Sequence, residues 1–282
     1  MLQIIIQGLL LSGLYALIAM GFMLIFSIGR TLNLAYGAYI MVGGYIYFWL
    51  SQQLGMPKII GFVGAVAVGA FMGLLKHRLI VKPLKGDAVA VEISTLILAV
   101  VMQSVVVLLF GDASKILLPI IPGVVTWSGA QVTYNILAAT VMSWIIILSL
   151  YAFVRGTHTG RAMQAVSMDP KGAAISGVDP DRINMITWAI SGGLGAAGGV
   201  FFASYTQLSP SMWVAPVIIS VAIVIVGGIG SIMGTLIVAH IIGFMEIFVS
   251  QWSPELRGVV TMLLIIGVLI LRPQGLFGRE EH

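Results

Sequence analysis

The residues of this sequence that could do chemistry are few and scattered. The chain has ten Asp and Glu residues, four His residues and no Cys among 282 residues. Without cysteine there is no thiolate nucleophile, cysteine metal site or disulfide. The His, Asp and Glu residues show neither metal-ligand spacing nor a Ser-His-Asp or paired-carboxylate arrangement. We therefore expect a protein that is not an enzyme.

Charge is concentrated in one stretch, from Arg155 to Arg182. This stretch carries seven of the twenty-four charged residues, and long apolar segments lie on both sides of it. Asp169-Pro170 and Asp179-Pro180 within it each fit a helix start. The Asp supplies the N-cap acceptor, and the Pro takes the first helical position, where its missing N–H costs nothing.

The Asp169 start predicts a short helix, Lys171–Ser176. Gly177 would close this helix as its C′ residue, because glycine accepts a left-handed conformation. The Asp179 start predicts the next apolar helix. Since a simple connector between helices needs only a few residues, the length, charge and helical build of 155–182 predict a surface that contacts another protein.

Several polar residues lie inside apolar segments. Asn33 lies in TLNLAYGAYIMVGGY, between two apolar stretches. It either caps the following helix or marks a broken helix whose free backbone groups line a polar route. His240 and Glu246 lie in one apolar segment, where an interfacial or packing role competes with a role in a transport pathway.

Two glycine-rich stretches interrupt the apolar pattern. Gly192, Gly195 and Gly199 in SGGLGAAGGVFFAS recur at helical spacing and predict close helix packing. VGGIGSIMG lacks both the strand context of G-x-G-x-x-G and the G-K-[ST] ending of phosphate-binding loops. We expect a helix break there, with Ser231 exposed in it, and no nucleotide site.

Composition places these features in a membrane. Hydrophobic residues make up 59% of the chain and charged residues 9%, whereas soluble domains carry about 25% charge. Apolar runs of about twenty residues fit spanning helices and not the alternating strands of a barrel. The net charge of +4 is interpreted as a signal of membrane topology. No basic patch has aromatic residues at the spacing that base stacking needs. Nucleic acid is therefore not an expected partner, whereas membrane lipid is.

The elements that must position these residues are nine apolar segments. They fall at 4–28, 35–53, 58–75, 91–110, 132–154, 184–206, 214–229, 231–250 and 256–271. The first lacks a basic n-region and a small-residue cleavage site, so we expect an uncleaved span. The second and seventh are weak, which leaves eight spans with a re-entrant piece as an alternative to nine. The fold class is an all-α integral membrane protein, with a single transmembrane domain over 1–282.

Lys and Arg are distributed unevenly over alternate connections. With the N-terminus outside, eleven lie on the cytoplasmic side, namely Arg30, Lys76, Arg78, Lys82, Lys85, Arg155, Arg161, Lys171, Arg182, Arg272 and Arg279. Three lie outside, namely Lys58, Lys115 and Arg257. The positive-inside rule thus predicts a cytoplasmic C-terminus and a cytoplasmic 155–182 stretch.

Three features near the ends of segments complete this topology. The basic loop Lys76–Asp87 would anchor the orientation or support a partner subunit. Glu92, at the start of the fourth segment, would snorkel at the membrane interface. The loop 112–131 would lie outside, with Trp127 as an interfacial anchor.

Two mechanisms are open on the residues alone. The first is a pore driven by a nucleotide-hydrolysing partner that acts on 155–182. The second is an ion-coupled carrier, in which Glu92, His240 and Glu246 would be the ion-binding candidates. The scarcity of buried charge favours the first. The broken, glycine-rich segments disfavour a third reading, a purely structural membrane subunit.

Four motifs together resemble a known family. GRTLNLAYGAYIMVGGY, GRAMQAVSMDPKGAAISGVDPDR, VGGIGSIMG and RPQGLFG are similar, in order and spacing, to the H-type permease subunit of branched-chain amino acid ABC importers. The resemblance implies the ABC importer permease fold in a bacterial inner membrane. The implied partners are a sister permease, two cytoplasmic ATPases that bind ATP and Mg, and a periplasmic binding protein. No cofactor is implied for this chain.

The resemblance also implies roles for individual residues. The ATPase-coupling positions are Gly160, Arg161, Asp169, Pro170, Ala173, Ala174 and Gly177. The substrate-pathway positions are Asn33, Ala35, Tyr36, Gly37, Gly227, Gly228, Gly230, Ser231 and Gly234. The implied substrates are branched-chain or related amino acids. Because Tyr36 and Ala38 depart from the residues common in many relatives, urea, short amides and aromatic acids are the alternatives.

Overall fold

A computed structural model describes residues 2–29, 32–84, 86–119, 121–127, 130–253, 256, 258–272 and 275–277. Four residues of the charge count lie outside the described residues, namely Arg30, Lys85, Arg257 and Arg279.

All nine apolar segments of the sequence form helices, with ends close to the expected ones. Their bounds are α1 (Leu2–Gly29), α2 (Tyr36–Phe48), α3 (Lys58–Lys76), α4 (Ala88–Phe110), α5 (Tyr134–Gly156), α8 (Pro180–Tyr205), α9 (Val214–Gly227), α10 (Ile232–Ser250) and α11 (Val259–Leu271). The π-helical turns η1 (Trp49–Gln53) and η2 (His77–Val81) extend α2 and α3. The helical membrane bundle is thus confirmed.

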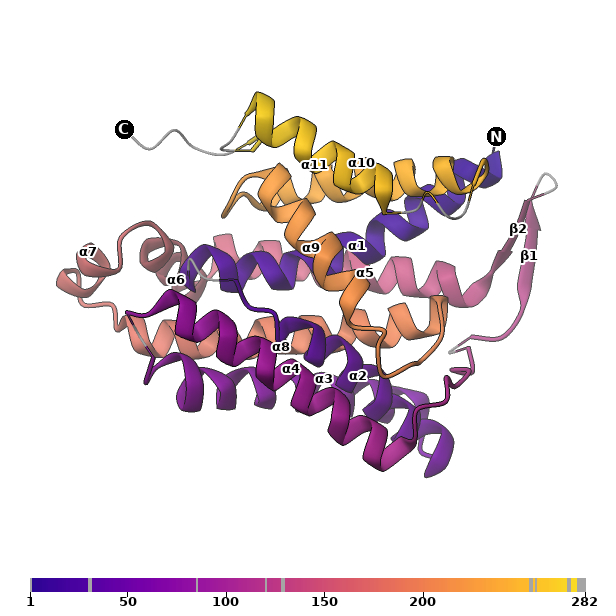
Figure 1. Ribbon diagram of the computed structural model, residues 1–282, viewed down its shortest axis with the longest axis horizontal. Coiled ribbons are helices and arrows are strands. Elements are labelled where there is room, and N and C mark those ends of the chain that lie inside the picture. Colours follow the sequence, from indigo (N-terminus) through magenta and orange to yellow (C-terminus); the bar gives the residue numbers. More distant parts are fainter. Residues whose placement is uncertain are drawn as a thin grey trace.

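The helices differ in length, and this bears on the number of spans. Among the described residues, six helical stretches are long and apolar enough to cross a membrane, and α9 is a shorter apolar helix. Both α2 and α9 begin partway along the bundle (Figure 1). Helix length alone therefore supports six spans and not eight or nine, because the second, seventh and ninth segments form the short helices α2, α9 and α11.

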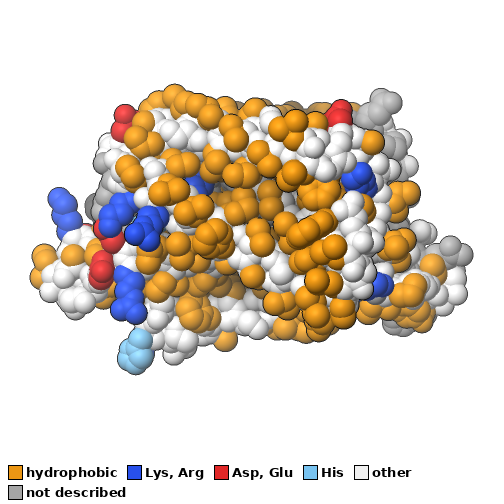
Figure 2. Space-filling model, turned by 90° about the horizontal axis from the view of Figure 1, so that it is seen from below, with side chains coloured by type: hydrophobic (Ala, Val, Ile, Leu, Met, Phe, Trp, Pro, Cys, Tyr) orange, Lys and Arg blue, Asp and Glu red, His pale blue; other side chains and the backbone are white. Residues whose placement is uncertain are grey.

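The centre of the bundle is formed by α1, α2 and α8. α8 packs on α3, α2 and α1, and α1 packs on α10. In Figure 1, α1, α3, α4, α5 and α8 run along the long axis, and two further helices, α6 (His158–Met168) and α7 (Pro170–Ile175), project at one end. Side chains of α4 face outward along most of its length, and a largely apolar surface results (Figure 2).

Glycines bring the backbones of the central helices into contact. A Cβ on Gly192 of α8 would collide with the Gly69 carbonyl of α3, and one on Gly199 would collide with the Ile40 carbonyl of α2. Without a hydrophobic drive between helices in lipid, such close approach supplies packing energy. The packing interpretation of the α8 glycines is confirmed.

A small hairpin lies at the end of the bundle opposite α6 and α7 (Figure 1). It joins β1 (Val124–Trp127) and β2 (Ala130–Thr133) as antiparallel strands with Val124 opposite Thr133. The sequence had predicted a loop over 112–131 and no strands within it. Val124–Trp127 does not alternate apolar and polar residues, so the pattern did not indicate a strand there.

Candidate functional site

The chain between α1 and α2 is not helical over Leu32–Ala35. The N-cap position of α2 is Ala35, and no side chain caps it. The side chain of Asn33 points elsewhere, so the capping interpretation of Asn33 is wrong. The break itself was expected, because a polar residue and several glycines there interrupt the apolar pattern.

Side chains of α4 satisfy the backbone of this break. The amide of Leu32 donates to Oε1 of Glu92, and the amide of Leu34 donates to Oγ1 of Thr95, both at 3.2 Å. Buried N–H groups outside regular structure need such acceptors. Glu92 is therefore a structural acceptor and not the snorkelling residue that its place at a helix start predicted.

Lys76 reaches the break from α3. Its side chain is 3% exposed, and its ammonium group donates to Oδ1 of Asn33. The ammonium lies 4.9 Å from the centre of the Trp188 ring and 5.8 Å from that of Tyr39. The prediction of a loop residue that anchors topology is wrong for Lys76, because α3 stays helical and turns this face toward α8. That prediction came from counting Lys and Arg residues in each connection, and such a count does not show which face of a helix a cation lies on.

Two polar groups beside Lys76 are neighbours that form no well-aligned hydrogen bond. The Asn33 side chain lies near the hydroxyl of Tyr39, but among the described residues neither Nδ2 of Asn33 nor this hydroxyl meets the geometry of a hydrogen bond. Both side chains are fully buried. The break thus contains a buried cation and unpaired donors at one place, an unusual arrangement since buried polar groups are normally paired.

The first turn of α2 packs against the first turn of α9. A Cβ on Gly37 would lie 2.6 Å from Cγ2 of Val217 and 2.9 Å from the carbonyl of Trp213. Tyr36 is buried beside it, and its hydroxyl donates to the carbonyl of Ile18 at 2.7 Å. The indole of Trp213 donates in turn to Gln103 of α4 at 2.7 Å. Two helix N-termini therefore meet inside the bundle.

A second break lies between α9 and α10. Gly228 and Gly230 take positive φ angles of 90° and 79°, which glycine adopts at little cost. Ser231 is the N-cap of α10, and its Oγ accepts from the amide of Gly234 at 3.0 Å. Gly227 and Gly234 bring the two helices into backbone contact. The predicted helix break is confirmed, and the partly exposed Ser231 closes it.

The predicted pathway residues fall into two groups. Asn33, Tyr36 and Gly37 belong to the first break, and the residues from Gly227 to Ser231 belong to the second. The second break adjoins the last turn of α1, where Gly230 faces Ser27. α1 ends at Gly29, just before the first break, so the end of α1 is next to both. Their role as a pathway stays a prediction.

The charged stretch 155–182 folds as two helices between α5 and α8. α6 was not expected, although Thr157 before it is a typical N-cap, and its Oγ1 accepts from the amide of Gly160 at 3.0 Å. Gly160 lies against the α5 backbone, where a Cβ would collide with Val154. Arg161, one residue on, is exposed. The fold thus separates these two predicted coupling residues into one packed and one exposed position.

The α7 helix has the expected start and end. Asp169 caps it through a 2.9 Å bond from the amide of Lys171, and Pro170 is its first residue. Gly177 has φ +84°, and the amide of Val178 donates to the carbonyl of Ala173 at 3.0 Å. This is a Schellman closure. The predicted short helix is confirmed.

The start of α8 is also confirmed, and the two sides of α7 differ in burial. Oδ1 of Asp179 accepts from the amides of Asp181 and Arg182 at 3.0 and 3.3 Å. On α7, Ala173 is buried against the bundle, whereas Ala174 is exposed. Of the paired alanines, Ala174 is the one on the outer surface.

The ionisable residues of α10 have packing partners. Glu246 is 5% exposed and accepts hydrogen bonds from the hydroxyls of Tyr15, at 2.6 Å, and Thr261, at 3.1 Å. Nδ1 of His240 lies 2.8 Å from the carbonyl of Leu236, and the centre of its ring lies 5.3 Å from that of Trp144, with the two planes tilted by 49°. Glu246 thus joins α1, α10 and α11, which supports the packing interpretation over a relay.

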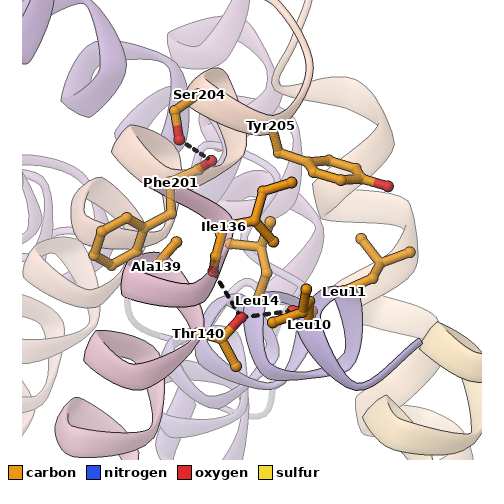
Figure 3. A pocket seen from close by; sticks show the side chains of 9 residues that line it. All are labelled: Leu10, Leu11, Leu14, Ile136, Ala139, Thr140, Phe201, Ser204 and Tyr205. Atoms are coloured by element: carbon orange, nitrogen blue, oxygen red, sulfur yellow. Dashed lines mark hydrogen bonds between the residues drawn. The ribbon is translucent and has the colours of Figure 1, made fainter. Parts of the chain in front are cut away.

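A small apolar cavity lies between α1, α5 and α8 (Figure 3). It is lined by Leu10, Leu11, Leu14, Ile136, Ala139, Thr140, Phe201, Ser204 and Tyr205. Its volume of about 10 Å³ gives room for at most one water molecule. Thr140 already donates to the carbonyls of Ile136 and Leu10 at 3.0 and 3.4 Å. This cavity is too small to be a solute pathway.

Comparison with known proteins identifies the family. The model of the branched-chain amino acid transport system / permease component matches residues 4–269. The high-affinity branched-chain amino acid transport system permease protein LivH of Escherichia coli strain K12 is 30% identical, over 99% of this chain and 96% of its own. The corresponding BraD protein of Pseudomonas aeruginosa is 27% identical over the same shares. The probable LivH permease of Methanocaldococcus jannaschii is 26% identical, over 98% of this chain and 92% of its own.

No solved structure matches this chain. The sequence matches cover nearly the whole helical bundle, both helix breaks and the α6–α7 pair. The chain therefore belongs to the family of permease components of branched-chain amino acid ABC transport systems, multi-pass membrane proteins that serve transport and not catalysis.

Proposed function

We propose that this chain is the permease subunit of an ATP-driven importer that carries branched-chain amino acids across the bacterial inner membrane. The curated relatives above are permeases of branched-chain amino acid transport and match along nearly their whole length. In this proposal the subunit pairs with a sister permease. Two cytoplasmic ATPases supply the energy, and a periplasmic binding protein delivers the solute.

The observation that carries the proposal is the surface of α6 and α7. These helices project from one end of the bundle (Figure 1) and expose two large apolar side chains, Met168 at 66% and Ile175 at 89%. Exposed apolar side chains on a charged surface of two capped helices are typical of a protein contact. In the proposal, the ATPase subunits cover this α6–α7 surface.

The distribution of charge supports the orientation. Exposed Lys and Arg side chains gather at the end that holds α6, α7 and η2 (Figure 2), namely Arg78, Lys82, Arg155, Arg161, Lys171 and Arg182. Lys82 forms a 3.1 Å ion pair with Asp181 there. We propose that this end faces the cytoplasm, together with the C-terminus, and that the N-terminus faces the periplasm.

The contacts of α6 suggest how a partner's movement would reach the pathway. α6 packs on α5, α1 and α8, and α1 leads directly into the first break. ATP binding that draws the ATPases together would displace α6 and α7. The end of α1 and both breaks would then shift between closed and open arrangements, as helix displacements do in other switching proteins.

The two breaks suit a zwitterionic solute. Helix N-termini attract a carboxylate, and free carbonyl groups attract an ammonium, so neither needs a permanent countercharge. In the proposal Asn33, Tyr36 and Gly37 line one side of the pathway. The residues from Gly227 to Ser231 line another.

Two substitutions at one residue test the coupling role. Gly177→Ala and Gly177→Asp both place a Cβ at φ +84°, where nothing lies within 4 Å of it, and Asp is strained no more than Ala in this left-handed region. Only Asp adds a charge. We expect both proteins to reach the membrane. Leucine uptake and leucine-stimulated ATP hydrolysis should be lost in Gly177→Asp and retained in Gly177→Ala. Normal uptake by Gly177→Asp would refute the coupling role.

A further inference from the structure

The cluster beneath the start of α2 has more hydrogen-bond donors than acceptors. The ammonium of Lys76 has three protons to donate, and Oδ1 of Asn33 is the acceptor that it meets. Nδ2 of Asn33 and the hydroxyl of Tyr39 are donors without a partner among the described residues. The three side chains are 3%, 1% and 0% exposed. Each therefore needs an acceptor that water outside the bundle does not supply.

The cluster also lacks a negative charge. Within the described part of the chain, no carboxylate lies within 4.0 Å of the Lys76 ammonium. Its neighbours are instead the ring faces of Trp188 and Tyr39, at 4.9 and 5.8 Å from the ring centres. Aromatic faces attract a cation but offset only part of the cost of burying it.

We propose that Lys76, Asn33 and Tyr39 form a binding site for the carboxylate of the transported solute. A carboxylate offers two oxygens with about four acceptor positions, which matches the donors that converge here. It also supplies the missing charge, and its bond to the ammonium is charge-assisted. This inference rests on the proposed function, which makes the solute an amino acid.

The site lies at the least regular part of the bundle core. The amides of Leu32 and Leu34 in the first break are held by Glu92 and Thr95 of α4, and not by helical hydrogen bonds. α4 itself packs chiefly on α2 and η2 and leaves most of its surface exposed. All three side chains of the site are buried in the structure. A displacement of α4 would release the amides of Leu32 and Leu34 on either side of Asn33.

If Lys76 served only to fasten the break, its replacement would behave differently. Removal of a structural cross-link lowers the stability of a protein. Replacement of a buried charge that lacks a counter-ion by an apolar side chain of similar length is neutral or stabilising. Stability and uptake therefore separate the two roles of Lys76.

The first test is Lys76→Met in the complete importer, reconstituted in proteoliposomes with its partner subunits and binding protein. We expect leucine uptake to fall more than about 20-fold, which corresponds to the loss of one charge-assisted contact, while the melting temperature stays equal or rises. Arg78→Met is the matched control, since Arg78 lies two residues along the chain and is exposed. It should retain uptake. Uptake by folded Lys76→Met within twofold of wild type would overturn the site.

A second variant keeps the test decisive if Lys76→Met does not fold. Asn33→Asp places a carboxylate beside the ammonium without a change in shape. We expect a raised melting temperature together with loss of leucine uptake, because the built-in carboxylate takes the place of the solute's. A purely structural cluster would instead give raised stability with normal uptake. If the wild-type importer carries no branched-chain amino acid, the proposed function fails, whereas normal uptake by Asn33→Asp overturns the site alone.

Discussion

Both helix breaks of this subunit were expected from polar residues and glycines in the sequence, but the breaks differ in construction. The break before α2 lies in the core, and two of its backbone amides are held by side chains of another helix, namely Glu92 and Thr95 of α4. The break between α9 and α10 is closed chiefly by its own residues, through Ser231 and two glycines with positive φ. The amide of Leu276 adds one distant contact, a 2.7 Å bond to the carbonyl of Val226. A break held by a distant helix responds when that helix moves, and a break closed chiefly by local residues depends on it less.

The largest expected difference concerns one added methyl group. Gly37→Ala would place Cβ 2.9 Å from the Trp213 carbonyl, so α2 and α9 must separate, at a cost of about 2–3 kcal/mol. Gly230→Ala meets nothing closer than 3.6 Å and should cost about 1–2 kcal/mol, from the φ strain alone. Thermal melting of the two purified variants compares them. Equal melting temperatures would show that the two helix breaks do not differ in how tightly they are packed.

An intermediate difference concerns the acceptor at each break. Thr95→Val keeps the shape of the side chain but leaves the amide of Leu34 buried without a partner, a loss of about 1–3 kcal/mol. Ser231→Ala removes the cap from Gly234 at a partly exposed site and should cost about 1 kcal/mol. We also expect Thr95→Val to lower leucine uptake more than Ser231→Ala does at matched protein levels. A larger loss of uptake in Ser231→Ala than in Thr95→Val would show that transport depends more on the second break.

The smallest expected effect is that of Glu92→Gln. The amide oxygen still accepts from Leu32, but the bond is no longer charge-assisted, so the loss should be about 1 kcal/mol or less. Glu92→Ala removes the acceptor and should cost more. Melting curves of both variants in the same detergent provide the measurement. Identical curves for Gln and Ala would mean that this contact does not hold the break.

Local signals in the sequence predicted the helix ends whose hydrogen bonds come from neighbouring residues. Asp169, Gly177 and Asp179 mark the bounds of α7 and the start of α8, because a cap and a C′ glycine depend on neighbouring residues only. The glycine-rich break near Ser231 was expected for the same reason. Continuous apolar runs located all nine segments, because membrane helices need such runs.

Long-range contacts could not be predicted in this way. Lys76 counted as one more cytoplasmic cation, and its partner Asn33 is 43 residues away in the chain. Glu92 resembled a helix-end carboxylate, although its function in the structure is to accept from a backbone amide 60 residues away. Which side chain satisfies a broken backbone depends on packing, and neither composition nor periodicity records packing.

The central claim is that this permease works by ATP-driven movement from its α6–α7 surface. The most direct measurement is leucine uptake by the complete importer in proteoliposomes, with and without ATP, and with the proton gradient collapsed by an uncoupler. The account predicts uptake that requires ATP and the ATPase subunits and is unchanged by the uncoupler. Uptake that persists without the ATPase subunits, or that stops when the gradient collapses, would contradict it and favour an ion-coupled carrier.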